Sequence, residues 1–191
     1  MHPAPTFLNL SYRFWTLIAA LDVLLFTFVI MPWGAARLTD YSGGLGPYDV
    51  MLSYSPELFY QIAEALGDAG RRFYIGFQLI ADTAYPLTYG LFAYFLLTWL
   101  CYTAWPERLW FRRIYWIPVV TVVLDFFENG LIVALLWQYP AQHPAWVQLA
   151  STMTTLKWVS VMVGSLVVVV LAGAALRRFL VERGQRVDNG G

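Results

Sequence analysis

Four long apolar segments constrain the fold of this chain more than any other feature of its sequence. Each has at least the roughly 20 residues that an α-helix needs to cross the hydrocarbon core of a bilayer. Because backbone N–H and C=O groups cannot stay unpaired in hydrocarbon, such segments cross it as helices. We therefore predict an all-α, polytopic membrane protein: a single domain over residues 1–191, built as a four-transmembrane-helix bundle. The expected spans cover about residues 12–32, 73–101, 114–137 and 147–176, with Pro32 closing the first.

A secretory signal peptide is the alternative interpretation of the first segment. Arg13 precedes its apolar run, and Gly34-Ala35-Ala36 has the small residues of a cleavage site. The run is longer than the apolar region of a usual signal peptide, however, and Asp22 interrupts it. We therefore interpret this segment as a retained span.

The composition excludes several classes of function. Hydrophobic residues make up 59% of the chain and charged residues only 13%, which is typical of membrane proteins. The formal net charge is zero and no basic patch is present, so no nucleic acid partner is expected. Cys101 is the only cysteine and both histidines lie outside the spans, so we expect no disulfide, metal site or cofactor. The motifs for nucleotide binding, zinc hydrolysis and serine hydrolysis are also absent.

Residues 34–72 form a polar connection that contains turn signals. Within it, Ser55, Pro56 and Glu57 have the order of an N-cap, a first-turn proline and a first-turn acid. The apolar face that follows and the stop at Gly67 predict a short amphipathic helix in this loop. Such a helix either lies on the membrane surface or caps a site between the spans.

The distribution of arginines predicts the orientation. Arg13, three arginines between the second and third spans, and four C-terminal arginines gather at one set of span ends. The opposite ends carry only Arg37, Arg71 and Arg72. By the positive-inside rule, we expect both termini in the cytoplasm and residues 34–72 outside.

Five ionisable residues interrupt the spans, and such residues are costly in hydrocarbon unless they face the bundle interior. Each lies roughly ten residues from the outer end of its span, or ~15 Å at 1.5 Å per residue, near the bilayer midplane. We therefore expect all of them to meet at one depth inside the bundle. They are Asp22, Asp82, Asp125, Glu128 and Lys157.

The second span carries a polar stripe at helical spacing. Tyr74, Gln78, Asp82, Tyr85 and Tyr89 follow one another at steps of four, four, three and four residues, which places them on one side of a helix. Proline at position 86 lacks an N–H and crowds the carbonyl four residues back, which belongs to the aspartate. A kink and an acid are therefore expected at the same turn.

The third and fourth spans add further polar groups at matching positions. Asp125, Glu128 and Asn129 lie within one turn of the third span, and Thr154 and Lys157 share a face of the fourth. Four acids and one lysine would carry a net charge of −3 if all were ionised. We expect the lysine to pair with one acid while other acids stay protonated, or a cationic ligand to enter.

These groups predict a site for acid–base chemistry on a lipid-like or amine-containing molecule. Asp82, Asp125, Glu128 and Lys157 are the candidate catalytic residues, with Asp82 as base or cation partner. The candidate ligand-binding residues are Gln78, Tyr85, Tyr89, Asn129, Thr154 and Asp22. The layout of four spans, a long first external loop and acids in the bundle resembles that of the sterol-isomerase and sigma-2 receptor group. The resemblance is one of layout, and no residue role is carried over from it.

Two other functions fit the same sequence. One is a proton- or cation-coupled carrier. The other is an accessory subunit in which polar side chains only hold helices together. Four spans are few for a carrier, and no inverted repeat is visible. A binding site requires a cavity beside the acids, whereas an accessory role requires the polar groups to satisfy one another. Besides membrane lipids, the expected partners are a small-molecule ligand and either a second copy of the chain or a membrane complex.

Overall fold

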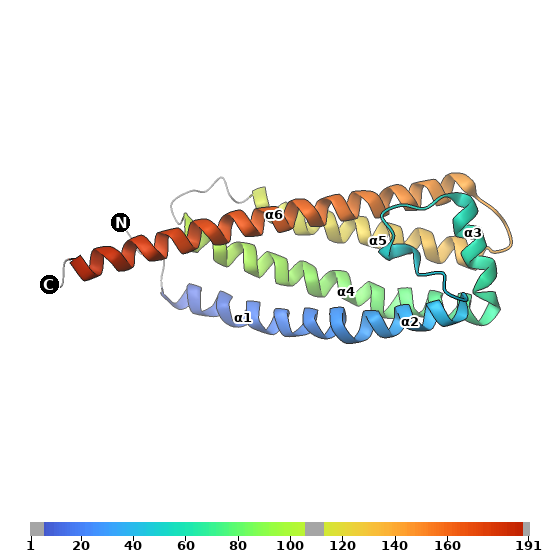
Figure 1. The fold of residues 1–191 in the computed structure, drawn as a ribbon, viewed down its shortest axis with the longest axis horizontal. Helices are drawn as coiled ribbons and strands as arrows, with labels where there is room; N and C mark the ends of the chain where they lie inside the picture. Colours follow the sequence, from blue (N-terminus) through green and yellow to red (C-terminus); the bar gives the residue numbers. More distant parts are fainter. Residues whose placement is uncertain (1–5, 106–112, 189–191) are drawn as a thin grey trace.

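The protein is a bundle of long helices (Figure 1). The computed structural model describes residues 6–105 and 113–188, and no strand occurs in these ranges. Four of the helical segments are long and apolar enough to cross a membrane: Arg13–Tyr41, Gly67–Ala104, Arg113–Trp137 and Pro144–Gln185. The expected all-α fold with four such segments is therefore confirmed at the level of helix length and composition.

The first segment continues past Pro32 instead of ending there. It consists of α1 (Thr6–Leu25), a wide π-helical turn (Phe26–Ile30) and α2 (Met31–Tyr41). In the wide turn, the backbone N–H of Met31 donates to the carbonyl of Phe26, five residues back. This turn comes directly before the proline, where an ordinary helical turn would press the ring against a carbonyl. The distortion that the proline demands is therefore absorbed locally, and the helix goes on.

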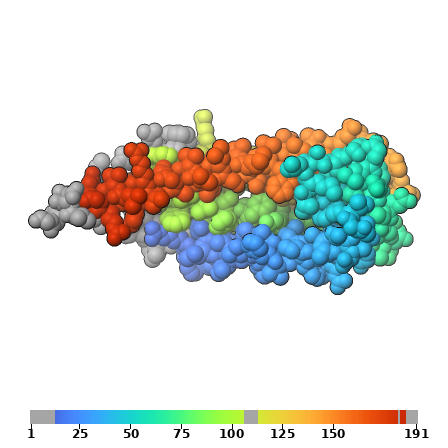
Figure 2. Space-filling view, viewed as in Figure 1, coloured from blue at the N-terminus to red at the C-terminus, as the bar shows by residue number. Residues whose placement is uncertain are grey.

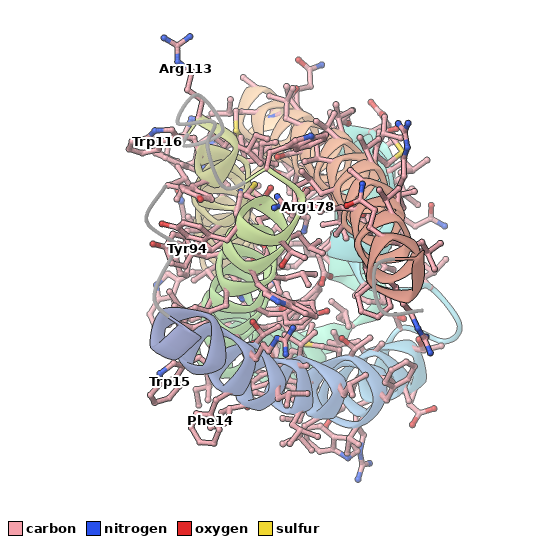
Figure 3. The ribbon with its side chains drawn as sticks, turned by 90° about the vertical axis from the view of Figure 1, so that its left-hand side faces the viewer. Phe14, Trp15, Tyr94, Arg113, Trp116 and Arg178 are labelled. Atoms are coloured by element: carbon pink, nitrogen blue, oxygen red, sulfur yellow. The ribbon has the colours of Figure 1, made fainter. Side chains whose placement is uncertain are left out.

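Helix α4 (Gly67–Ala104) lies at the centre of the packing. It contacts α1, α5 (Trp116–Trp137) and α6 (Pro144–Asp188), and α5 packs along α6. Helix α1, in contrast, packs mainly on α4 and is not among the helices that contact α6 extensively. In the space-filling view, α4 is visible along a furrow between α1 and α6 (Figure 2). Viewed along the bundle, Phe14, Trp15 and Trp116 point outward (Figure 3), as expected of side chains that face lipid or its interface.

One end of the bundle is closed by the connection between α2 and α4. It contains a 3₁₀ turn, η2 (Tyr48–Val50), and helix α3 (Pro56–Ala65). The Ser55 side chain accepts a hydrogen bond from the Leu58 N–H, which is the N-cap expected from the sequence. Gly67, with a φ of 59°, makes the left-handed turn that separates α3 from α4. We call residues 42–66 the cap.

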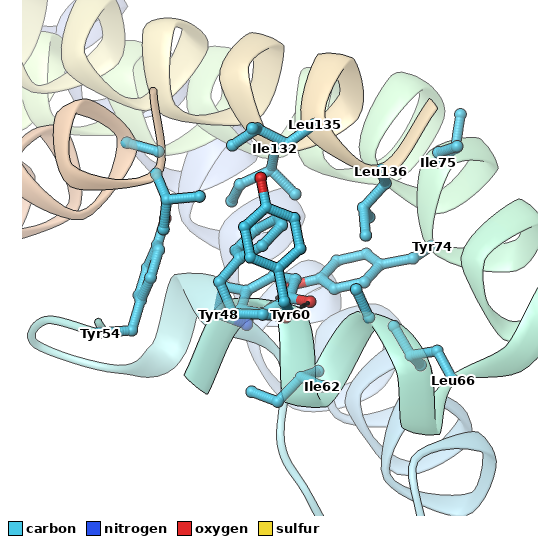
Figure 4. Close-up of a cluster of buried hydrophobic side chains, with 14 of the residues drawn as sticks. Tyr48, Tyr54, Tyr60, Ile62, Leu66, Tyr74, Ile75, Ile132, Leu135 and Leu136 are labelled. Atoms are coloured by element: carbon cyan, nitrogen blue, oxygen red, sulfur yellow. Dashed lines mark hydrogen bonds between the residues drawn. The ribbon is translucent and has the colours of Figure 1, made fainter. Parts of the chain in front are cut away.

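Aromatic side chains fix the cap on the bundle (Figure 4). The Tyr48 ring stacks on Phe59 and Tyr74, with centroid distances of 4.3 and 5.5 Å. The Tyr48 hydroxyl donates to the Phe59 carbonyl at 2.9 Å, and the Tyr54 N–H donates to Ser151 Oγ on α6 at 2.9 Å. Burial raises the pKa of the Tyr48 and Tyr54 hydroxyls well above their ordinary value. The cap is therefore a packed part of the fold rather than a loose loop.

A second apolar cluster lies at the other end of the bundle, where α4 meets α6. Its buried members are Leu97, Leu100, Cys101, Ala104, Leu171 and Ala175. The polar residues of α4, α5 and α6 lie between this cluster and the cap. Two apolar ends thus enclose one polar layer.

Candidate functional site

Lys157 is the centre of the polar layer. Its Nζ lies 2.5 Å from Glu128 Oε2 and 3.4 Å from Asp125 Oδ1. All three residues are less than a tenth exposed. The two carboxylates belong to neighbouring turns of α5, three residues apart, so one ammonium on α6 reaches both. With all three groups ionised the cluster carries a charge of −1, and burial in the bundle favours one added proton or cation.

Hydroxyl groups hold both carboxylates from their other sides. The Tyr89 hydroxyl of α4 donates to Asp125 Oδ2 at 2.7 Å. Thr154, one turn before Lys157 on α6, donates to Glu128 Oε1 at 2.7 Å. The three helices that carry the site are therefore tied together by charge-assisted hydrogen bonds, which are stronger than neutral ones.

Asn129 repairs the backbone of α4 at its proline. Pro86 has no N–H, so the carbonyl of Asp82, four residues earlier, has no ordinary helical partner. The Asn129 side chain of α5 donates to that carbonyl at 2.8 Å. The amide therefore fixes the turn of α4 that carries Asp82.

The Asp82 carboxylate is the least satisfied acid of the layer. It is 5% exposed, and its Oδ2 atom has no hydrogen-bond partner among the described residues. Gln78, one turn closer to the cap on the same face of α4, is 1% exposed, and neither of its side-chain amide atoms has a partner there. Because buried polar atoms nearly always have a partner, these groups are suited to receive one from a ligand or from water.

A cavity of about 660 Å³ adjoins this layer. Asp82, Asp125 and Lys157 line it at one side, and Tyr85 and Tyr89 add hydroxyl groups. Its other walls are mostly apolar and come from the wide turn between α1 and α2, from α2, α4, α5 and α6, and from the cap. These apolar wall residues include Met31, Phe92, Leu96, Ile117, Val161 and Val168. An apolar chamber with a few converging polar groups is the usual form of a small-molecule site.

Tyr85 links the cavity to the first helix. Its hydroxyl lies 2.9 Å from Thr27 Oγ1, and its ring stacks on Phe26 at a centroid distance of 5.6 Å. Both partners belong to the wide turn between α1 and α2. The distorted turn therefore contributes directly to the cavity wall.

The structure brings together most of the residues that the sequence singled out. Five of the ten line the cavity: Asp82, Asp125, Lys157, Tyr85 and Tyr89. Three others lie behind the lining: Glu128 pairs with Lys157, and Asn129 donates to the Asp82 carbonyl. Thr154 donates to Glu128, and Gln78 lies one turn from Asp82 on α4.

Asp22 does not join the others, contrary to the expectation that all five ionisable groups face inward. Its side chain is exposed, and it does not line the cavity. It precedes Thr27, which does line the cavity, by five residues, or about 140° around a helix. The position of Asp22 along its span was used to predict its depth, but it does not determine the side of the helix on which the side chain lies.

Asp49 is a residue of the site that the sequence did not predict. It lies in η2 of the cap, lines the cavity and accepts a hydrogen bond from the Tyr74 hydroxyl at 2.9 Å. The residues around it are turn formers without helical periodicity, so no spacing pattern pointed to it. Only the interpretation of residues 34–72 as a cap over the site gave a signal. Thr121 and Ser160, whose hydroxyls lie 2.6 Å apart on the cavity wall, were also missed.

Among the described residues, no three His, Cys, Asp or Glu side chains are grouped in a way that could hold a metal ion. The polar side chains that line the cavity offer carboxyl, ammonium and hydroxyl groups. No protein-family model matches the sequence, no curated protein matches it, and no solved structure matches the fold.

Proposed function

We propose that this protein is an integral membrane protein that binds or converts a lipid-like or amine-containing small molecule by acid–base chemistry at a buried site near the bilayer midplane. The observation that carries the proposal is the cavity of about 660 Å³, which joins apolar walls to Asp82, Asp125 and Lys157. Its size lies within the roughly 300–1,000 Å³ of known small-molecule sites. A role as an accessory subunit does not account for such a cavity.

The furrow between α1 and α6 is the proposed route by which the ligand enters. Helix α1 packs mainly on α4, and the cavity is lined by Thr27 of the wide turn that follows α1, by Met31 of α2 and by residues of α6. A molecule dissolved in the membrane can therefore reach the apolar walls sideways without crossing the cap. This route favours ligands with an apolar body and one polar group.

The polar groups have different proposed roles. Asp82, whose Oδ2 has no partner among the described residues, receives a proton or an ammonium group from the ligand. Lys157 and Asp125 are already paired, so they supply a fixed electrostatic field and, through Tyr89, a hydroxyl next to the ligand. Glu128 is fully buried behind Lys157 and holds the ammonium in place.

The arginines also indicate how the protein is oriented in the membrane. We propose that both termini are cytoplasmic and that the cap, with α3 at the membrane surface, faces outward. The arginine distribution supports this arrangement.

The test is ligand retention by matched acid variants. Wild type, Asp82→Asn and Asp22→Asn are purified in mild detergent, and native mass spectrometry and lipidomics identify what remains bound. Dodecylamine, dodecanol and dodecanoic acid are then compared as added probes. We expect wild type and Asp22→Asn to bind an apolar ligand and Asp82→Asn to lose it, because Asp82 lines the cavity and Asp22 does not.

Two outcomes would contradict the proposal. One is the absence of any bound or added ligand in wild type. The other is equal retention by Asp82→Asn and wild type. Misfolding of Asp82→Asn, judged by its elution in size exclusion, would favour a structural role for the acid, and Asp82→Glu then tests binding with the carboxylate kept.

A further inference from the structure

A second cavity, of about 300 Å³, lies on the cap side of Asp82. Its walls come from α2, from the cap and from α4, and include Ala35, Pro47 and Phe77. None of these three lines the first cavity. It therefore extends beyond the first cavity, from Asp82 toward the capped end of the bundle, and the two cavities share Thr27, Met31, Asp49, Val50 and Asp82.

Two carboxylates lie where the cavities meet. Asp49 and Asp82 line both of them. Asp49 is half-buried, and its neighbour Val50 is 59% exposed, so this edge of the cavity reaches the surface of the cap. The Tyr74 hydroxyl fixes Asp49 at this edge through a 2.9 Å hydrogen bond. The two acids thus mark an outer and an inner end of the same space.

A polar atom without a partner lies at the inner end. Asp82 Oδ2 is buried and has no hydrogen-bond partner among the described residues. Both side-chain amide atoms of Gln78, one turn away on α4, also have no partner there, although Gln78 lines neither cavity. A buried polar group left unpaired costs about 1–3 kcal/mol. A cavity of this size has room for several water molecules, and water settles where polar atoms can bind it.

We propose that the second cavity is an aqueous passage that carries water and protons between the capped surface and Asp82, with Asp49 at its mouth. A proton that leaves the Asp82 carboxyl passes to a water in the passage and then to Asp49 or bulk water. The reverse transfer restores it. This inference rests on the proposed acid–base role of Asp82, and it gives the site two entrances: the furrow for an apolar ligand and the passage for protons.

The test measures whether water reaches position 82 and by which route. Cys101 is first replaced by Ala, and Asp82→Cys is introduced into that full-length chain in lipid nanodiscs, where both ends of the bundle are accessible. The probe is the membrane-impermeant trimethylammonium-ethyl methanethiosulfonate, which reacts with thiolates in contact with water. Ala35→Trp is added to fill the second cavity. Ala36→Trp is the matched control, because Ala36 is exposed and lines neither cavity.

We expect Asp82→Cys to react, Ala35→Trp to slow the reaction roughly tenfold or more, and Ala36→Trp to leave it unchanged. No reaction at position 82 would overturn the passage. An equal rate with and without Ala35→Trp would also overturn it, since water would then arrive by another route. Size exclusion and thermal unfolding verify that each variant is folded, and if either Trp variant is not, Ala35→Phe and Ala36→Phe replace the pair. Because the readout needs no ligand, failure of the proposed function leaves this result unaffected.

Discussion

Lys157 is the residue on which the buried ion pairs converge, and its removal alone leaves two carboxylates without a cation. The neighbouring hydroxyls of Tyr89 and Thr154 can donate hydrogen bonds but supply no charge. The stability of the polar layer therefore depends on the whole set rather than on any single pair.

We expect Lys157→Met to lower the free energy of unfolding by about 3–5 kcal/mol, because it leaves buried charge unpaired. Adding Asp125→Asn and Glu128→Gln to the same chain removes that charge and recovers much of the loss. Thermal and denaturant unfolding in nanodiscs measures both variants. Equal stability of the single and triple variants would contradict this explanation.

Asn129 and Pro86 form a second dependent pair. Asn129→Ala leaves the Asp82 carbonyl without its donor, which we expect to cost about 1–3 kcal/mol. Pro86→Ala returns an N–H to α4 that can serve the same carbonyl, so Asn129→Ala should cost much less in a Pro86→Ala background. A double-mutant cycle on unfolding free energies checks this. Additive effects would show that the two residues act independently.

At the scale of elements, the long helices and the start of α3 were predictable because their signals are local. Apolar length determines a span, and Ser55 followed by Pro56 marks an N-cap. The continuation past Pro32 was not predictable in this way, because the wide turn that accommodates the proline has no residue signature. The placement of Asp49 and the outward direction of Asp22 depend on how elements pack, which periodicity within one segment does not determine.

Two glycines of α4 differ in the space around them, so substituting each by alanine tests packing and helix propensity separately. A Cβ at Gly90 would lie 2.6 Å from Val122 Cγ2 of α5, whereas a Cβ at Gly76 meets nothing within 4 Å. We therefore expect Gly76→Ala to stabilise the protein by up to about 1 kcal/mol through reduced backbone entropy. Gly90→Ala should destabilise it by about 1–3 kcal/mol through overpacking between α4 and α5. The melting temperatures of the two variants provide the comparison, and a shift of the same sign in both would contradict it.

For the whole molecule, the sequence predicted four long apolar helices, and Asp125, Glu128 and Lys157 do meet inside the bundle, but the sequence did not predict the two cavities. Both cavities have walls from the cap and from α4, and the larger one also has walls from α5 and α6, so each depends on how distant segments pack together. The acid layer was predictable because charge inside an apolar helix is itself a strong signal.

The proposed orientation makes a prediction at this scale. In a chain that carries Cys101→Ala, Leu52→Cys lies on the exposed surface of the cap, and Arg183→Cys lies near the exposed end of α6. An impermeant maleimide added to intact cells should label the first at once and the second only after permeabilisation. The opposite pattern would reverse the orientation, and immediate labelling of both would contradict an arrangement with the cap and the C-terminus on opposite sides.

The wide turn before Pro32 has a mechanical consequence. It interrupts the regular hydrogen-bond pattern of the first long helical segment, whose α1 part packs mainly on α4, and Thr27 within it lines both cavities. We therefore expect bending at this turn to disturb few packed side chains and to widen the space beside the acids.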